Sequence, residues 1–251
     1  MTPTLLVIAL LLAQRGAPAP TPKAAAPIDL TGYWISLVSE DWKFRMTPPL
    51  KGDFGFGLDP KDQDVQRKRM TIPLNALGRK TALEWDPAKD EAEGNQCKAY
   101  GAAGIMWIPE RLHITWENDT TLRIDTDAGM QTRLFYFSAA PRLGAAPAWQ
   151  GVSIAQWMND GNRESPRNGR MKVMTTLMRP GYYWKNGMPY GANAVMTEHF
   201  RRVTLPAGEE MMIVTIVVED PQYLAGPYIR SANFKKLPDG SGWNPTPCST
   251  R

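Results

Sequence analysis

The stretch that decides the fold is AVMTEHFRRV, from Ala194 to Val203. Read with a period of two, one face carries Met196 and Phe200, and the other face is more polar, which is typical of a strand with one buried side. Glu198 lies between Met196 and Phe200, on the side that we expect to be buried. A buried carboxylate either pairs with a cation or takes a raised pKa, so the role of Glu198 is a central question.

Segments with the same rhythm follow one another along most of the chain, separated by turns that contain Gly, Pro, Asn or Asp. An up-and-down run of antiparallel strands must close or be covered, because open sheet edges aggregate. We therefore predict an all-β fold, an antiparallel barrel with one helix in an early insert, which Asn75 caps and which ends at Pro87. The predicted strands lie within residues 28–38, 111–118, 121–127, 130–137, 147–157, 170–178, 192–203, 209–219 and 228–237.

The 251 residues fit one large β domain, and neither a repeat nor a break in composition marks a second one. We interpret residues 1–13 as a signal peptide, because the apolar run in it is too short to span a bilayer. Residues 14–27 are a Pro/Ala-rich tether, and 28–251 form the single barrel domain. The Pro/Gly-rich segment 47–60 is the only candidate linker, and we expect it to lie on the barrel.

The expected location is therefore the periplasm or the outside of the cell, with no stable membrane insertion after the signal is cleaved. An uncleaved N-terminal anchor is the alternative. The formal charge is +4, and the basic residues are densest at Gln66–Arg69 and His199–Arg202. Nucleic-acid binding needs a larger clustered basic face, so we do not expect it.

The chain has two cysteines, Cys97 and Cys248. An even count in an exported protein suggests a disulfide, which here would staple the C-terminal tail to an early loop. Two free thiols are the alternative. The cysteine spacing fits no zinc pattern, and His113 and His199 stand far apart without an HxH or HExxH spacing, so we predict neither a metal nor a cofactor.

Several short motifs stand out along the chain: Thr31–Trp34, Cys97, Pro147–Trp157, Met196–Val203, Val217–Tyr223, Pro227 and Cys248. Together they resemble a group of exported, β-rich bacterial proteins of unknown function with a lipocalin-like (calycin-type) barrel. The resemblance implies a lipocalin-like barrel, an export route and a Cys97–Cys248 disulfide. It implies no reaction, because a shared barrel does not fix the chemistry.

Three roles are open for Glu198. It forms a buried ion pair with Arg133, Lys172 or Arg230 from a neighbouring strand, it contacts a ligand, or it acts as a general acid or base. For a ligand inside the barrel, Glu198 and Arg202 would orient a polar group. The expected apolar contacts are Trp34, Tyr136, Met196 and Phe200.

The function that we favour from the sequence is the binding of a small apolar or amphipathic ligand inside or at the mouth of the barrel. The alternative is an enzyme of the lyase or isomerase type, with Glu198 as the base and His199 or Tyr136 assisting. A third class is a structural protein of the cell envelope.

Overall fold

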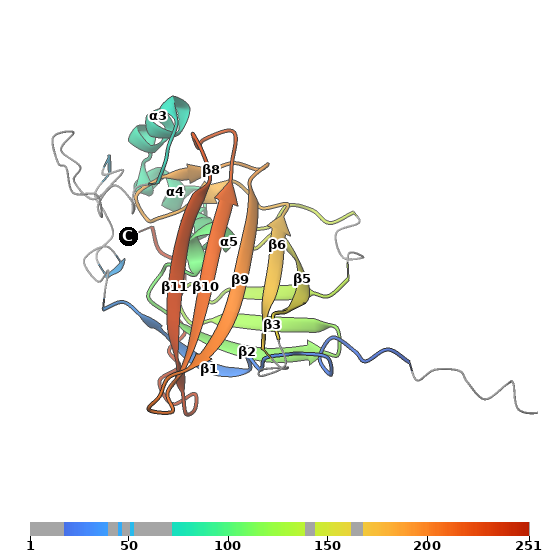
Figure 1. Cartoon of the computed structure of the whole chain (residues 1–251). Helices are drawn as coiled ribbons and strands as arrows, with labels where there is room; N and C mark the ends of the chain where they lie inside the picture. Colours follow the sequence, from blue (N-terminus) through green and yellow to red (C-terminus); the bar gives the residue numbers. More distant parts are fainter. Residues whose placement is uncertain are drawn as a thin grey trace, which may run out of the picture.

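The computed structural model describes residues 18–39, 45–46, 51–52, 72–138, 144–161 and 168–250. Strands close into a nine-membered barrel in the order β1-β11-β10-β9-β6-β5-β4-β3-β2 (Figure 1). Their bounds are β1 Gly32–Leu37, β2 Arg111–Asn118, β3 Thr121–Thr126, β4 Thr132–Tyr136, β5 Val152–Asn159, β6 Gly169–Thr176, β9 Val195–Thr204, β10 Glu210–Glu219 and β11 Tyr228–Leu237. Each predicted strand segment overlaps one of these strands, although β5, β6 and β9 each extend past the predicted bounds by one or two residues.

One pair of neighbours in the barrel is parallel. Phe135 of β4 pairs with Ser153 of β5 in that sense, and every other neighbouring pair is antiparallel. In a closed ring with an odd number of strands, the directions cannot alternate all the way round, so at least one pair must be parallel. The prediction of a fully antiparallel barrel was therefore wrong at this pair.

The two-residue rhythm of β9 appears in the structure as predicted. Met196, Glu198 and Phe200 are fully buried, whereas His199 on the opposite face is partly exposed. Apolar side chains from all sides fill the interior, and burial of each large one stabilises the fold by about 1.5–3 kcal/mol. They include Trp34, Leu112, Ile114, Leu122, Ile124, Phe135, Met171, Val173, Met212, Val214, Ile216, Val218, Ala232 and Phe234.

Helical elements lie between β1 and β2 and gather at one end of the barrel (Figure 1). The side chain of Asn75 accepts a hydrogen bond from Gly78 N and begins the first helix. Pro87 does not only follow that helix; it is also the first residue of the next one, which Asp86 caps. Where one helix was predicted, residues 72–110 of the described structure hold several: α3 Ala76–Glu84, α4 Pro87–Ala92, the 3-10 helix η2 Gln96–Tyr100 and α5 Ala102–Ile105.

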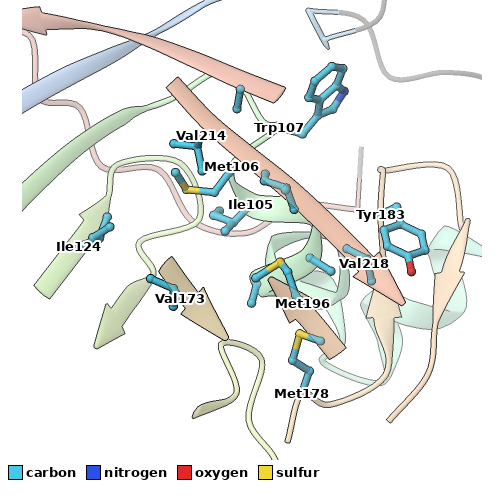
Figure 2. Close-up of a cluster of buried hydrophobic side chains, with 14 of the residues drawn as sticks. Ile105, Met106, Trp107, Ile124, Val173, Met178, Tyr183, Met196, Val214 and Val218 are labelled. Carbon is cyan, nitrogen blue, oxygen red and sulfur yellow. The ribbon is translucent and has the colours of Figure 1, made fainter. Parts of the chain in front are cut away.

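Helix α5 closes one end of the barrel. Ile105 and Met106 are fully buried, and Figure 2 shows them in one cluster with side chains of β3, β6, β9 and β10, labelled Ile124, Val173, Met196, Val214 and Val218. We call residues Gly101–Trp107 the plug, and the end of the barrel that they enter the mouth. A short hairpin, β7 Gly181–Tyr182 and β8 Pro189–Tyr190, lies at the same end.

Aromatic side chains gather at the opposite end. The ring centroid of Phe137 lies 5.7 Å from that of Trp116 and 5.2 Å from that of Trp157. The Trp157 indole N–H donates to the carbonyl of Pro22 at 2.7 Å, so the described part of the tether lies against this end. Residues 1–13, and residues 47–50 and 53–60 of the candidate linker, lie outside the described residues.

Cys97 and Cys248 form a disulfide with an S–S distance of 2.04 Å, which confirms the predicted pairing. Cys97 belongs to η2, directly before the plug, so the bond ties this region to the C-terminal tail. The tail is also held by Thr246 N, which donates to the carbonyl of Asp127 at 2.8 Å. No helix in the described ranges is long and apolar enough to cross a membrane.

Candidate functional site at the plugged mouth

Glu198 is one half of a buried ion pair with Arg133. Nη1 and Nη2 of Arg133 donate to Oε1 and Oε2 of Glu198 at 2.9 and 2.6 Å, and both side chains are 0% exposed. Arg133 is one of the three partners that the sequence left open. Lys172 instead lies on the outer face, paired in register with His199. The ion-pair role of Glu198 is therefore the one observed.

The residues considered for catalysis are not brought together. Both carboxylate oxygens of Glu198 are engaged by Arg133. His199 follows Glu198 directly and so lies on the opposite face of β9. Tyr136 lies on the face of β4 opposite to the buried Arg133 and Phe135. His199 and Tyr136 therefore both lie on the outer face of the barrel wall, whereas Glu198 lies inside it.

The expected ligand contacts are divided between the interior and other places. Trp34, Met196 and Phe200 do lie inside, but each is 0% exposed within the packed core. Arg202 lies near the end of β9 away from the plug, where it donates to the carbonyl of Asp29 at 3.2 Å and pairs with Glu210. Tyr136 is outside the barrel. Trp34, Met196 and Phe200 are therefore part of the packed core.

Polar groups with unused hydrogen-bonding capacity occur at the mouth. Arg230 of β11 is 7% exposed and donates from Nη2 to the carbonyl of Ala103 in α5. Within the described part of the chain, its Nε and Nη1 have no hydrogen-bond partner. The Arg230 guanidinium carbon lies 5.2 Å from the ring centroid of Trp107 and 5.5 Å from that of Tyr228. A charged donor thus lies close to two rings, with part of its hydrogen-bonding capacity unused.

Tyr183 extends this cluster. Its ring centroid lies 5.5 Å from that of Tyr228. Neither the Tyr183 hydroxyl nor the Trp107 indole N–H has a hydrogen-bond partner among the residues described. Burial raises the pKa of Tyr183, with a further contribution from Asp220, and Arg230 opposes the shift. The phenol is therefore neutral and able to donate. We call Trp107, Tyr183, Tyr228 and Arg230 the aromatic box.

Two arginines hold the plug in place. Arg45 donates from Nε to the carbonyl of Trp107 and from Nη1 to the carbonyl of Leu37, both at 2.9 Å. Arg230 holds the carbonyl of Ala103 from the other wall. Carbonyl groups at the end of a short helix need such donors, because they have no partner within the helix. The plug is thereby tied to β1 and β11, and the aromatic box has fixed walls.

Glu110, three residues after the end of the plug, is a second buried carboxyl group. Its backbone pairs with Ser36, but both side-chain oxygens are buried and without a partner in the described part of the structure. Burial raises the pKa of Glu110 well above its usual value, and Asp127 raises it further; Arg45 and Arg133 oppose the shift. This geometry favours the neutral carboxylic acid.

The sequence carried a signal for Glu110 that our prediction did not use. In WIPERLHI, Glu110 shares a face with Leu112 and Ile114 when the segment is read with a period of two. The same argument had singled out Glu198. The box is harder to find in this way, because Trp107 and Tyr183 belong to loops that have no regular period.

A small, open pocket lies near the disulfide, and its lining includes Asp90, Lys98 and Tyr182. Both carboxylate oxygens of the buried Asp90 in this lining have hydrogen-bond partners. Asp90 accepts hydrogen bonds from Trp85 Nε1 at 3.0 Å, from Lys98 Nζ at 2.5 Å and from the Tyr182 hydroxyl at 2.8 Å. These bonds join α3, α4, η2 and β7, so we assign this cluster a structural role.

In the ranges that the structure describes, no group of three or more His, Cys, Asp or Glu side chains is placed to hold a metal ion. Comparisons with models of protein families, with curated proteins and with solved structures find no match to this chain.

Proposed function

We propose that the protein binds a small amphipathic ligand at the mouth of its barrel, in the aromatic box beside the plug. The observation that carries this proposal is the buried guanidinium of Arg230, in which two nitrogen atoms, Nε and Nη1, have no acceptor among the described residues. Leaving a buried donor unpaired costs about 1–3 kcal/mol, and more when the group is charged. A ligand that supplies acceptors there recovers this cost.

The composition of the box supports an amphipathic ligand. Small-molecule sites are mainly apolar with a few placed polar groups. Here three rings supply apolar surface, and Arg230 supplies most of the polar capacity. The sequence-based hypothesis allowed a ligand either inside the barrel or at its mouth. We now favour the mouth, because Trp34, Met196 and Phe200 are buried in the core.

We also propose that the protein works in the periplasm or outside the cell. Disulfides persist in oxidising compartments and are rare where thiols are kept reduced. The Cys97–Cys248 bond supports that assignment. The expected signal peptide at residues 1–13 would provide the route.

The test is a titration with the neutral fluorescent probe N-phenyl-1-naphthylamine. We expect saturable binding to the folded protein and a loss of at least tenfold in affinity for Trp107→Leu. The matched control is Trp157→Leu, at the opposite end of the barrel, which should bind as the wild type does. Circular dichroism establishes that each variant is folded. The absence of saturable binding, or a loss confined to Trp157→Leu, contradicts the proposal.

A further inference from the structure

We infer that the polar group of the ligand is an anion, a carboxylate that Arg230 holds, joined to a flat apolar body that lies against the rings of Trp107 and Tyr228. This inference rests on the proposed function and deepens it by naming the chemical class of the ligand.

The unused hydrogen-bonding groups of the box are chiefly donors. They are Nε and Nη1 of Arg230, the indole N–H of Trp107 and the hydroxyl of Tyr183. A carboxylate is a pure acceptor with about four lone-pair sites, so its oxygens can accept charge-assisted hydrogen bonds from Arg230. An ammonium group has donors only, so it would leave these groups unpaired and would face the charge of Arg230.

The charge balance of the barrel leads to the same class. The positive charge of Arg133 is neutralised by Glu198. Arg230 forms no ion pair with an acid of the described residues, although it is almost completely buried. The charge of Asp220 acts on the neighbouring Tyr183. The Asp220 carboxylate accepts hydrogen bonds from the backbone N–H groups of Gly191 and Gln222 at 2.9 and 3.0 Å. An isolated buried charge is costly, and an anionic ligand supplies the missing partner.

The aromatic rings near Arg230 indicate the chemistry of the apolar part of the ligand. Trp107 and Tyr228 flank the guanidinium, and Tyr183 meets Tyr228 at a steep angle of 73° between the rings. Rings prefer to meet other rings in offset or edge-to-face arrangements, which favours an aromatic body over a flexible chain. The class that fits both parts of the box is a small aryl carboxylate.

The experiment compares three probes that share one body and differ in the polar group: 4-phenylbutyrate, 4-phenylbutanol and 4-phenylbutylamine. Each displaces N-phenyl-1-naphthylamine from the wild-type protein. We expect the acid to bind at least tenfold more tightly than the alcohol, and the amine to bind most weakly. Arg230→Gln should abolish the preference for the acid, and Arg230→Lys should keep part of it. Arg123→Gln, on the outside of β3 beside Asp125, is the control and should keep all of it.

The outcomes separate this inference from the proposed function. Equal binding of the acid and the alcohol, or an acid preference that survives in folded Arg230→Gln, overturns the anion inference and leaves ligand binding standing. If the naphthyl probe itself does not bind, the proposed function fails. If Arg230→Gln does not fold, Trp107→Phe replaces it: loss of the indole N–H should weaken the acid several-fold and leave the alcohol unchanged, and an equal loss for both overturns the inference.

Discussion

Arg133 and Glu198 join opposite parts of the barrel wall through its interior. Arg133 belongs to β4 and Glu198 to β9, which are separated by β5 and β6 in the order of the barrel. Their two parallel hydrogen bonds, at 2.9 and 2.6 Å, lie in a dry core. The pair therefore fixes the distance between two strands that share no backbone hydrogen bonds.

A double-mutant cycle tests this role. Removal of one member of a buried ion pair leaves the other charge unpaired, which typically costs about 3–5 kcal/mol. We expect Glu198→Leu and Arg133→Met each to lower the free energy of unfolding in urea by about that amount. The double variant should be more stable than either single variant, because no uncompensated charge remains. A double variant as unstable as the sum of the singles would contradict the pairing.

Glu110 should make the protein less stable as the pH rises. Its pKa is raised in the folded protein, so between the unfolded value near 4.5 and the raised value the folded state binds the proton more tightly than the unfolded state does. The free energy of unfolding then falls as the pH rises through this window, by up to about 1.4 kcal/mol per pH unit for one group. Below pH 4.5 the contribution is fully present.

The measurement for Glu110 is urea unfolding between pH 4 and 8. Glu110→Gln, which cannot ionise, should remove this part of the decline. Glu117→Gln, at a side chain that is 45% exposed, is the control and should keep it. Identical pH dependence of the wild type and Glu110→Gln would show that Glu110 is not a buried neutral acid.

The disulfide should contribute strongly to stability, because it links residues 151 positions apart. In the chain-entropy model, a bond that closes so long a loop stabilises the protein by about 5 kcal/mol. We expect dithiothreitol to lower the melting temperature of the wild type markedly. The variant with both Cys97→Ser and Cys248→Ser should melt at that lower temperature with or without the reductant. An unchanged melting temperature of the reduced wild type would refute a stabilising role.

Two glycines with positive φ distinguish backbone strain from steric clash. Gly129 has φ +76°, and an added Cβ would lie 2.2 Å from Tyr100 Cδ1, whereas Gly208 has φ +85° and open space around it. Gly208→Ala should cost about 1–2 kcal/mol from the left-handed backbone alone. Gly129→Ala should cost about 1–3 kcal/mol more, because the Tyr100 ring must move. Equal losses in chemical denaturation would mean that this close packing is absent.

The sequence predicts the local features well and the long-range ones poorly. The period of two predicted where the strands lie and that Glu198 points inward, and Asn75 predicted the start of a helix. These features could be predicted because each signal lies within a few residues of sequence. Closure through the parallel pair of β4 and β5 depends on the total number of strands, and no short segment encodes it. For the same reason, the sequence left Arg133 as one of three possible partners of Glu198.

The mouth shows why the site itself was missed. On β11, Arg230 points inward and is 7% exposed, whereas the preceding Ile229 is 59% exposed. This is the reverse of what polarity predicts for two neighbouring strand residues. The plug GAAGIMW is too short for a recognisable helical period, so its entry into the barrel was not predictable either.

The central claim is that a ligand binds at the mouth, beside the plug. The most direct measurement is a ¹⁵N–¹H NMR titration of the folded protein with N-phenyl-1-naphthylamine. We predict that the largest shifts occur at the indole N–H of Trp107 and at the backbone amides of Ala103 and Arg230. Shifts confined to the indoles of Trp116 and Trp157 at the opposite end, or no saturable shifts at all, would contradict it.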